Sequence, residues 1–245
     1  MVKINNINLK NEDILFTKRS DWVVKQYLHV HINRDGERYF LKFRKKHNRS
    51  YIEVATHQYF ADTVKSLFDL KKVGVEVVYD SIEGFAIKQK WHNNIGTVKS
   101  LNNSKNTTWA TSTNLIELIK ICFFDGLIGS LDRHGNNVLV LNDMSLLAID
   151  DEDLFYYEQP HWIKFDKNIR RLLLIEYNDS KELLESYKEK IRGLSTEILD
   201  TIETIGNNND SKIRYWERPY INQFKTAFNN YDLIWSRMIE QFNRN

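Results

Sequence analysis

The chain has 245 residues, enough for one large hydrophobic core or two small ones. Hydrophobic residues make up 42% of it and charged residues 28%, which is typical of a globular protein and excludes a disordered chain. The formal net charge of +2 gives no reason to expect nucleic acid or an anionic membrane as a partner.

The single cysteine and the apolar runs indicate where the protein resides. Cys122 has no second cysteine to pair with, so an internal disulfide framework is excluded. The range 1–10 lacks the apolar stretch of a signal peptide, and no apolar run approaches the roughly 20 residues that span a bilayer. We therefore expect a cytoplasmic protein.

The amino-terminal part has the pattern of a small antiparallel sheet. The ranges 13–18 and 22–32 are rich in β-forming residues. A turn signal at 33–36 then leads into a third strand over 37–43. This pattern predicts a three-stranded meander with Lys42 on its third strand.

One helix and two more strands follow the meander. The range 50–70 has apolar residues at helical spacing. The ranges 75–81 and 84–91 read as strands on either side of a turn at Glu83-Gly84. The polar range 92–112 is then predicted as a hinge or linker, so that 1–91 forms one lobe and 113–245 another.

The second half is mostly helical. An apolar helix is predicted over 113–131, with Thr113 or Asn114 as its cap. Two short strands, 137–141 and 145–150, flank a turn at Asn142-Asp143. The remaining predicted helices cover 166–178, 180–192, 194–206 and 216–243.

Three oxygen-bearing side chains surround the two short strands. Asp132 and Asn137 are five residues apart just before the first strand, and Asp150 ends the second. A tight hairpin would bring all three to one end. Carboxylate and amide oxygens suit Mg²⁺, which also takes phosphate oxygens as ligands. The spacing of Asp132 and Asn137 also matches the protein-kinase catalytic loop.

The order of the residues after Asp132 points to particular kinases. The motif DRHxxN, formed by Asp132, Arg133, His134 and Asn137, together with the later AIDDEDLF, resembles HipA-like bacterial protein kinases and the related phosphoinositide lipid kinases. The resemblance implies a two-lobed, protein-kinase-like α+β fold, with a small strand-rich lobe and a larger helical lobe. It also implies the use of ATP and Mg²⁺.

The resemblance further implies a role for each residue of the motifs. Asp132 would be the catalytic aspartate, and Asn137 and Asp150 the metal ligands. His134 would buttress the loop, and Arg133 would hold a neighbouring carboxylate or phosphate.

Two features of those kinases are missing. No glycine follows Asp150 as in the DFG motif of protein kinases, and no glycine-rich phosphate loop is present. The range 17–22 stands where that loop is expected, so Lys18, Arg19 and Ser20 are predicted to grip phosphates with their side chains. Ser20 is then also a candidate site of autophosphorylation.

The remaining ATP contacts are predicted from position. Lys42 can reach the α- and β-phosphates, with Glu53 in the next helix as its ion-pair partner. The range 86–91, which includes Gln89, occupies the hinge position, where backbone groups would meet adenine.

Each of these residues also has an ordinary structural explanation. Asp132 could cap a turn, Asn137 could adopt a left-handed conformation, and Lys42 could be a solvated strand lysine. Glu53 could simply favour a helix start through the helix dipole. The basic run 44–49 is read as an exposed loop, because it lacks the interleaved aromatic residues of a nucleic-acid site.

The joint pattern favours an ATP-dependent phosphotransferase, with a protein Ser/Thr hydroxyl as acceptor and a small-molecule alcohol as the second choice. A cognate regulator or antitoxin protein is a candidate partner; nucleic acid and membrane are not. The alternatives are a catalytically weak pseudokinase that binds nucleotide or protein, and a kinase-fold enzyme that transfers AMP.

Overall fold

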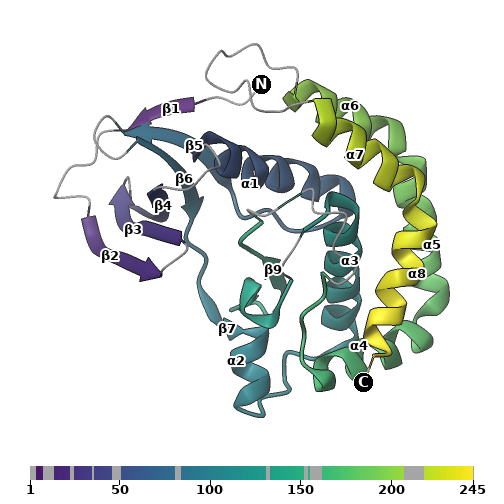
Figure 1. The fold of residues 1–245 in the computed structure, drawn as a ribbon. Coiled ribbons are helices and arrows are strands. Elements are labelled where there is room, and N and C mark those ends of the chain that lie inside the picture. The colour runs from purple at the N-terminus through teal and green to yellow at the C-terminus, as the bar shows by residue number, and fades with distance from the viewer. Residues whose placement is uncertain are drawn as a thin grey trace.

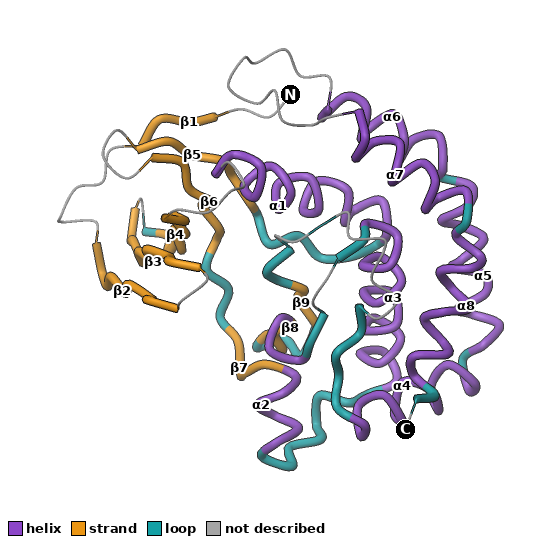
Figure 2. The backbone as a smooth tube through the Cα atoms, viewed as in Figure 1, coloured by secondary structure: helices purple, strands orange, loops and turns teal. Residues whose placement is uncertain are grey.

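The computed structural model describes residues 4–7, 14–22, 25–34, 36–45, 51–80, 84–130, 133–151, 154, 162–206 and 218–244. Over these residues, no helix combines the length and the apolar character needed to cross a membrane. The strands β1–β6 gather on one side of the molecule and the helices α3–α8 on the other, with α1 between them (Figures 1 and 2).

The amino-terminal lobe is built on a six-stranded sheet with the order β1-β5-β6-β4-β3-β2. Its strands are β1 (Ile4–Ile7), β2 (Ile14–Trp22), β3 (Lys25–Arg34), β4 (Glu37–Lys45), β5 (Val75–Asp80) and β6 (Gly84–Lys90). The predicted meander is β2-β3-β4, which is antiparallel throughout. Gly36 makes the tight β3-β4 turn possible, because its φ of +78° is a conformation that side chains disfavour. The parallel pairing of β1 with β5 was not predicted.

The predicted helix at 50–70 is α1 (Tyr51–Lys65), followed by the short 3-10 helix η2 (Ser66–Phe68). The helical run ends before residue 70, because Asp69 caps η2 in a left-handed conformation with a φ of +54°. The Leu70 amide then bonds to the Lys65 carbonyl oxygen at 3.0 Å. The helix packs against β5 and β6, so its buried face points toward the centre of the molecule.

The range 92–112, predicted as a hinge or linker, contains β7 (Asn94–Thr97) and α2 (Val98–Asn103). Thr97 and Ser100 form a reciprocal capping box at the start of α2. The strand β7 pairs with β8 in a second sheet of order β7-β8-β9. This segment is therefore anchored to the carboxy-terminal lobe, and its role as a hinge stays a prediction.

The carboxy-terminal lobe contains α3 (Ser112–Ile128), β8 (Val138–Leu141), β9 (Leu146–Ala148), α4 (Lys167–Asp179), α5 (Lys181–Gly193), α6 (Ser195–Gly206), α7 (Arg218–Asn229) and α8 (Tyr231–Phe242). A further short 3-10 helix, η3, covers Gly135–Asn137. The helix α3 is central to this lobe and is buried along most of its length.

Two predictions about these helices were wrong. The cap of α3 is Thr111, whose side chain accepts a hydrogen bond from the Asn114 amide, and not Thr113 or Asn114. The single helix predicted over 216–243 is divided into α7 and α8 at Asn230. The Asn230 side chain donates to the Thr226 carbonyl at 2.8 Å. An asparagine that bonds to the preceding turn competes with the helix backbone, which ends α7 there.

The main hydrophobic core joins the two lobes. It includes Phe60 and Phe68 from the α1 region, Phe123 and Phe124 from α3, and Trp235 from α8. A smaller core lies in the amino-terminal sheet, around Leu41 and Phe43 of β4. Because one core is shared by α1 and α3, the position of α1 is tied to the carboxy-terminal lobe.

Candidate active site

The hairpin formed by β8 and β9 positions two of the predicted site residues. Val138 pairs with Ala148, so the next positions, Asn137 and Ile149, face each other at the open end. The Ile149 amide donates to the Asn137 carbonyl oxygen at 2.9 Å. Asp150 follows directly. The structure thus brings Asn137 and Asp150 to one end of the hairpin, while Asp132 lies outside the described residues.

The loop before the hairpin is held on several sides. The backbone amide of Arg133 donates to the Trp162 carbonyl oxygen at 3.0 Å, and the backbone carbonyl oxygen of Arg133 accepts from the Lys164 amide at 2.7 Å. The His134 side chain caps η3 by accepting from the Asn136 amide. This position agrees with the buttressing role predicted for His134.

The helix α2 supports the same loop from outside. A Cβ atom on Gly135 would lie 2.9 Å from both the backbone nitrogen and the Cβ of Lys99. Only a glycine therefore allows the loop and α2 to approach this closely. Sequence patterns did not indicate this contact.

Lys42 reaches the hairpin from the amino-terminal lobe. It lies on β4, as predicted, and its side chain is 14% exposed. Its Nζ is 2.9 Å from Oδ1 of Asp150. Asp150 has a φ of +64°, which is uncommon for a residue other than glycine. A lysine and a carboxylate thus meet between the lobes at a strained backbone position, a combination found at functional sites.

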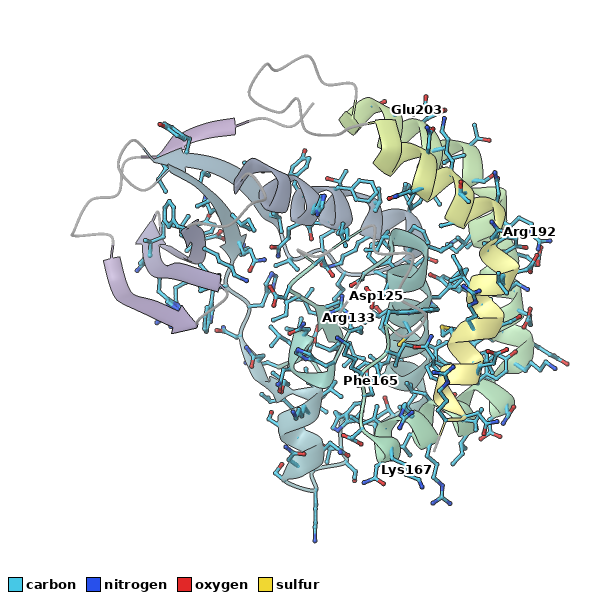
Figure 3. All side chains as sticks on the ribbon, viewed as in Figure 1. Asp125, Arg133, Phe165, Lys167, Arg192 and Glu203 are labelled. Carbon is cyan, nitrogen blue, oxygen red and sulfur yellow. The ribbon has the colours of Figure 1, made fainter. Side chains whose placement is uncertain are left out.

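A buried network of charges lies directly behind this contact. Asp151, 1% exposed, receives Lys65 Nζ at 2.5 Å and Arg133 Nη2 at 2.6 Å. Arg133 also binds Asp125 through Nε at 2.6 Å and Nη2 at 2.9 Å. Figure 3 shows Asp125 and Arg133 side by side next to α3. Two cations and two anions balance each other, as a buried cluster requires.

The network also fixes the backbone of the hairpin. Arg133 Nη1 donates to the carbonyl oxygens of Asn137 at 2.8 Å and Ile149 at 3.0 Å. Lys65 Nζ donates to the carbonyl oxygen of Ala148 at 2.8 Å. Residues on both sides of the predicted metal ligands are therefore held from α1 and from the loop. Arg133 does hold neighbouring carboxylates, as the sequence predicted.

Burial and charge act in opposite directions on these groups. Burial raises the pKa of Asp125 above its usual range, although Arg133 opposes this. Burial also favours the neutral form of Asp151, but the charges of Lys65 and Arg133 outweigh it, so the pKa of Asp151 is lowered. For Arg133, burial is outweighed by the two carboxylates, and its pKa is raised. The arginine remains charged.

Sequence reasoning missed Lys65, Asp125 and Asp151 as part of the site. A usable signal was present for the first two, because each is a charged residue on the buried face of an apolar helix. Asp151 occupies the position after Asp150 where the DFG motif would have a different residue, but no local pattern indicates a role for it. Its two partners lie 18 and 86 positions away in the sequence.

The predicted phosphate-gripping segment is not a loop. Residues 17–22 lie inside β2, where Lys18 pairs with His29 and Ser20 with Tyr27 of β3. The strand β2 continues to Trp22, so the whole predicted segment lies within it. The side chains of Lys18, Arg19 and Ser20 lie outside the part that the structure describes, so their contacts with phosphate and the autophosphorylation of Ser20 stay predictions.

The predicted adenine-contacting range is also part of a strand. Gln89 lies on β6, between Phe40 of β4 and Val75 of β5. The strand β6 pairs with both β4 and β5 and ends at Lys90. The contact of the range 86–91, including Gln89, with adenine stays a prediction. Glu53 lies near the start of α1, and its side chain falls outside the described set.

The donors at the hairpin fit a magnesium ion. Over the described residues, His, Cys, Asp and Glu form no group of three or more that could hold a metal. Asn137 and Asp150 nevertheless supply an amide oxygen and a carboxylate oxygen. Magnesium is commonly held by one or two protein oxygens together with substrate phosphates and water. This donor set therefore suits Mg²⁺ arriving with a nucleotide.

Comparison with known proteins supports the fold. No protein-family model and no curated protein sequence matches the chain. A solved structure, that of the proinflammatory kinase CtkA of Helicobacter pylori, is similar to it with a TM-score of 0.52 and 14% sequence identity. The match covers 96% of this chain and 99% of that one. The predicted kinase-like α+β fold, with a strand-rich amino-terminal lobe and a helical carboxy-terminal lobe, is confirmed.

Proposed function

We propose that the protein is an ATP-dependent phosphotransferase that transfers the γ-phosphate of ATP to a Ser or Thr hydroxyl of a protein. The contact of Lys42 with Asp150, at the hairpin end that also holds Asn137, carries this proposal. A lysine of one lobe and a carboxylate of the other lie within hydrogen-bonding distance there, which is what a phosphate-binding cation and a metal-binding carboxylate would require. In a kinase-like fold, ATP binds between such groups.

Each residue has a distinct task in the proposed reaction. Lys42 exchanges its bond with Asp150 for bonds to the α- and β-phosphates. Asn137 and Asp150 would hold Mg²⁺, which would neutralise the phosphate charge. Asp132 orients the acceptor hydroxyl and takes its proton. A bond forms between the hydroxyl oxygen and the γ-phosphorus, while the bond from that phosphorus to the β–γ bridging oxygen breaks and ADP leaves.

The buried network supports this chemistry without touching the substrate. Lys65 and Arg133 hold the backbone carbonyls just before Asp150 and the Asp151 side chain just after it. Most of the rate enhancement in phosphoryl transfer comes from positioning and electrostatics, so a rigid Asp150 matters more than an added catalytic group.

A protein that binds nucleotide without phosphate transfer is the second candidate. The observation that favours it is β2, which holds no glycine and so lacks the backbone phosphate cradle of active protein kinases. A regulator or antitoxin protein is the partner that we propose for either form, and a small-molecule alcohol is the alternative acceptor for an active enzyme.

Incubation of the full chain with γ-labelled ATP, Mg²⁺ and a cell lysate tests the proposal. We expect label on Ser or Thr residues with the parent protein and none with Asp132→Ala. Nucleotide binding without labelling would favour the pseudokinase. A product carrying AMP, identified by mass spectrometry, would show that the protein transfers a nucleotide and not a phosphate.

A further inference from the structure

A cavity of about 410 Å³ lies in the carboxy-terminal lobe, separate from the contact between Lys42 and Asp150. The end of α3 forms one wall, and α7 and α8 form the opposite wall. A volume of this size falls in the range of small-molecule sites. Among the described residues that were predicted from the sequence to bind ATP or metal, none lines it.

Apolar side chains form the inner part of the cavity. Trp162 is held rigidly, because its Nε1 donates to the Cys122 carbonyl at 2.8 Å. A Cβ on Gly126 would lie 2.6 Å from Trp162 and 2.7 Å from Ile234, so only glycine leaves these two side chains in place. Leu233, which is 48% exposed, also lines the cavity. Such a surface suits a flat apolar group.

One charged side chain of the cavity lining, that of Arg237, has no partner of opposite charge among the described residues. Among the described lining residues, Asp125 and Arg237 are the two that carry a charge. Asp125 is fully buried and is neutralised by Arg133. Within the described part of the chain, the guanidinium of Arg237 makes no ion pair or hydrogen bond, nor do the side-chain amides of Asn222 and Gln223. The described part of the lining therefore offers one free cation and two free amides to a ligand.

The cavity lies close to the catalytic loop in sequence and in space. Ser130, one of its lining residues, donates its amide to the Asp125 carbonyl at 2.8 Å and lies two positions before Asp132. The Asp125 carboxylate, behind the same wall, holds Arg133. A ligand in the cavity would therefore rest against the segment that anchors the loop.

We propose that this cavity binds a small anionic ligand with a flat, aromatic body and a carboxylate that pairs with Arg237. The ring occupies the space beside Trp162, Ile234 and Leu233. The amides of Asn222 and Gln223 donate to its remaining acceptors. This site is distinct from the nucleotide site and does not depend on phosphotransfer activity.

Isothermal titration of the full chain with 1-naphthoate, and with uncharged 1-naphthylmethanol, tests the proposal. We expect 1-naphthoate to bind with a Kd of about 1 mM, as suits a ligand of its size. Arg237→Gln should weaken 1-naphthoate binding about tenfold through loss of a charge-assisted hydrogen bond, without changing 1-naphthylmethanol binding. Thr226→Phe, at an exposed lining position, should fill the space and remove both probes.

The matched control is Arg171→Gln, which removes an equal charge from an exposed position on α4 outside the cavity. It should leave both affinities unchanged. Absence of 1-naphthoate binding to the parent, equal binding to Arg237→Gln, or equal weakening by Arg171→Gln would each overturn the proposal. Because the readout is binding, failure of the phosphotransfer assay would leave it unaffected.

Discussion

Replacement of Lys65 by methionine probes the buried network directly. Methionine keeps most of the length of the side chain but removes its charge. Asp151 then loses one of its two cations, and the Ala148 carbonyl loses a donor at 2.8 Å. Removing one partner of a buried ion pair costs about 3–5 kcal/mol. Arg133 still faces Asp151 at 2.6 Å, so we expect the lower end, about 3 kcal/mol.

Thermal unfolding followed by far-UV circular dichroism measures this loss. In a chain of this length, each kcal/mol shifts Tm by about 2–4 °C, so Lys65→Met should lower Tm by roughly 6–12 °C. Lys72→Met is the control, because Lys72 is exposed a few residues beyond α1 and surface changes stay within about 0.5 kcal/mol. If the two variants unfold at the same temperature, the pairing of Lys65 with Asp151 is refuted.

The remaining predictions concern the hairpin and the phosphates. Asp150→Ala should weaken Mg-dependent ATP binding in a calorimetric titration while Asp132→Ala leaves it nearly intact, and equal losses would contradict the separate roles. Lys42→Ala should weaken ATP binding about tenfold to a hundredfold with unchanged Tm, and unaltered binding would mean that another lysine holds the phosphates. Ser20→Asp should lower ATP affinity whereas Ser20→Ala should not; identical affinities would place the phosphates elsewhere. Hydrogen bonds from Ser145, with Lys71, lower the pKa of Asp143 to about 2. A depressed carboxyl pKa stabilises the fold above about pH 4 and loses this effect as pH falls toward 2, so an NMR titration of Asp143 with a midpoint near 4 would disprove it.

Local patterns were sufficient for most secondary structure. Lys42 could be placed on the third strand of a meander because alternation and turn signals act over a few residues. The same holds for the hairpin that joins Asn137 to Asp150, since a short turn leaves few possible registers. Motif order pointed to a kinase-like fold, which the structural comparison confirmed.

The exact ends of strands and helices were harder to predict from the sequence. The strand β2 continues through residues 17–22, although the absence of glycine there was already visible. The break between α7 and α8 at Asn230 could not be predicted, because apolar residues recur at helical spacing on both sides of it. The extension of β2 depends on its pairing with β3. The helix break depends on a hydrogen bond from the Asn230 side chain to the preceding turn. Neither interaction produces a periodic pattern in the sequence.

What the sequence determined by itself was the fold class, the main elements and the oxygen donors beside one hairpin. The three-dimensional structure was needed to show that Lys65 meets Asp151 across 86 positions and that Arg133 joins Asp125 to the hairpin backbone. It alone also formed the cavity between α3, α7 and α8. The physical reason is that local periodicity specifies which face of an element is buried, whereas the partner on that face is chosen by packing among distant segments.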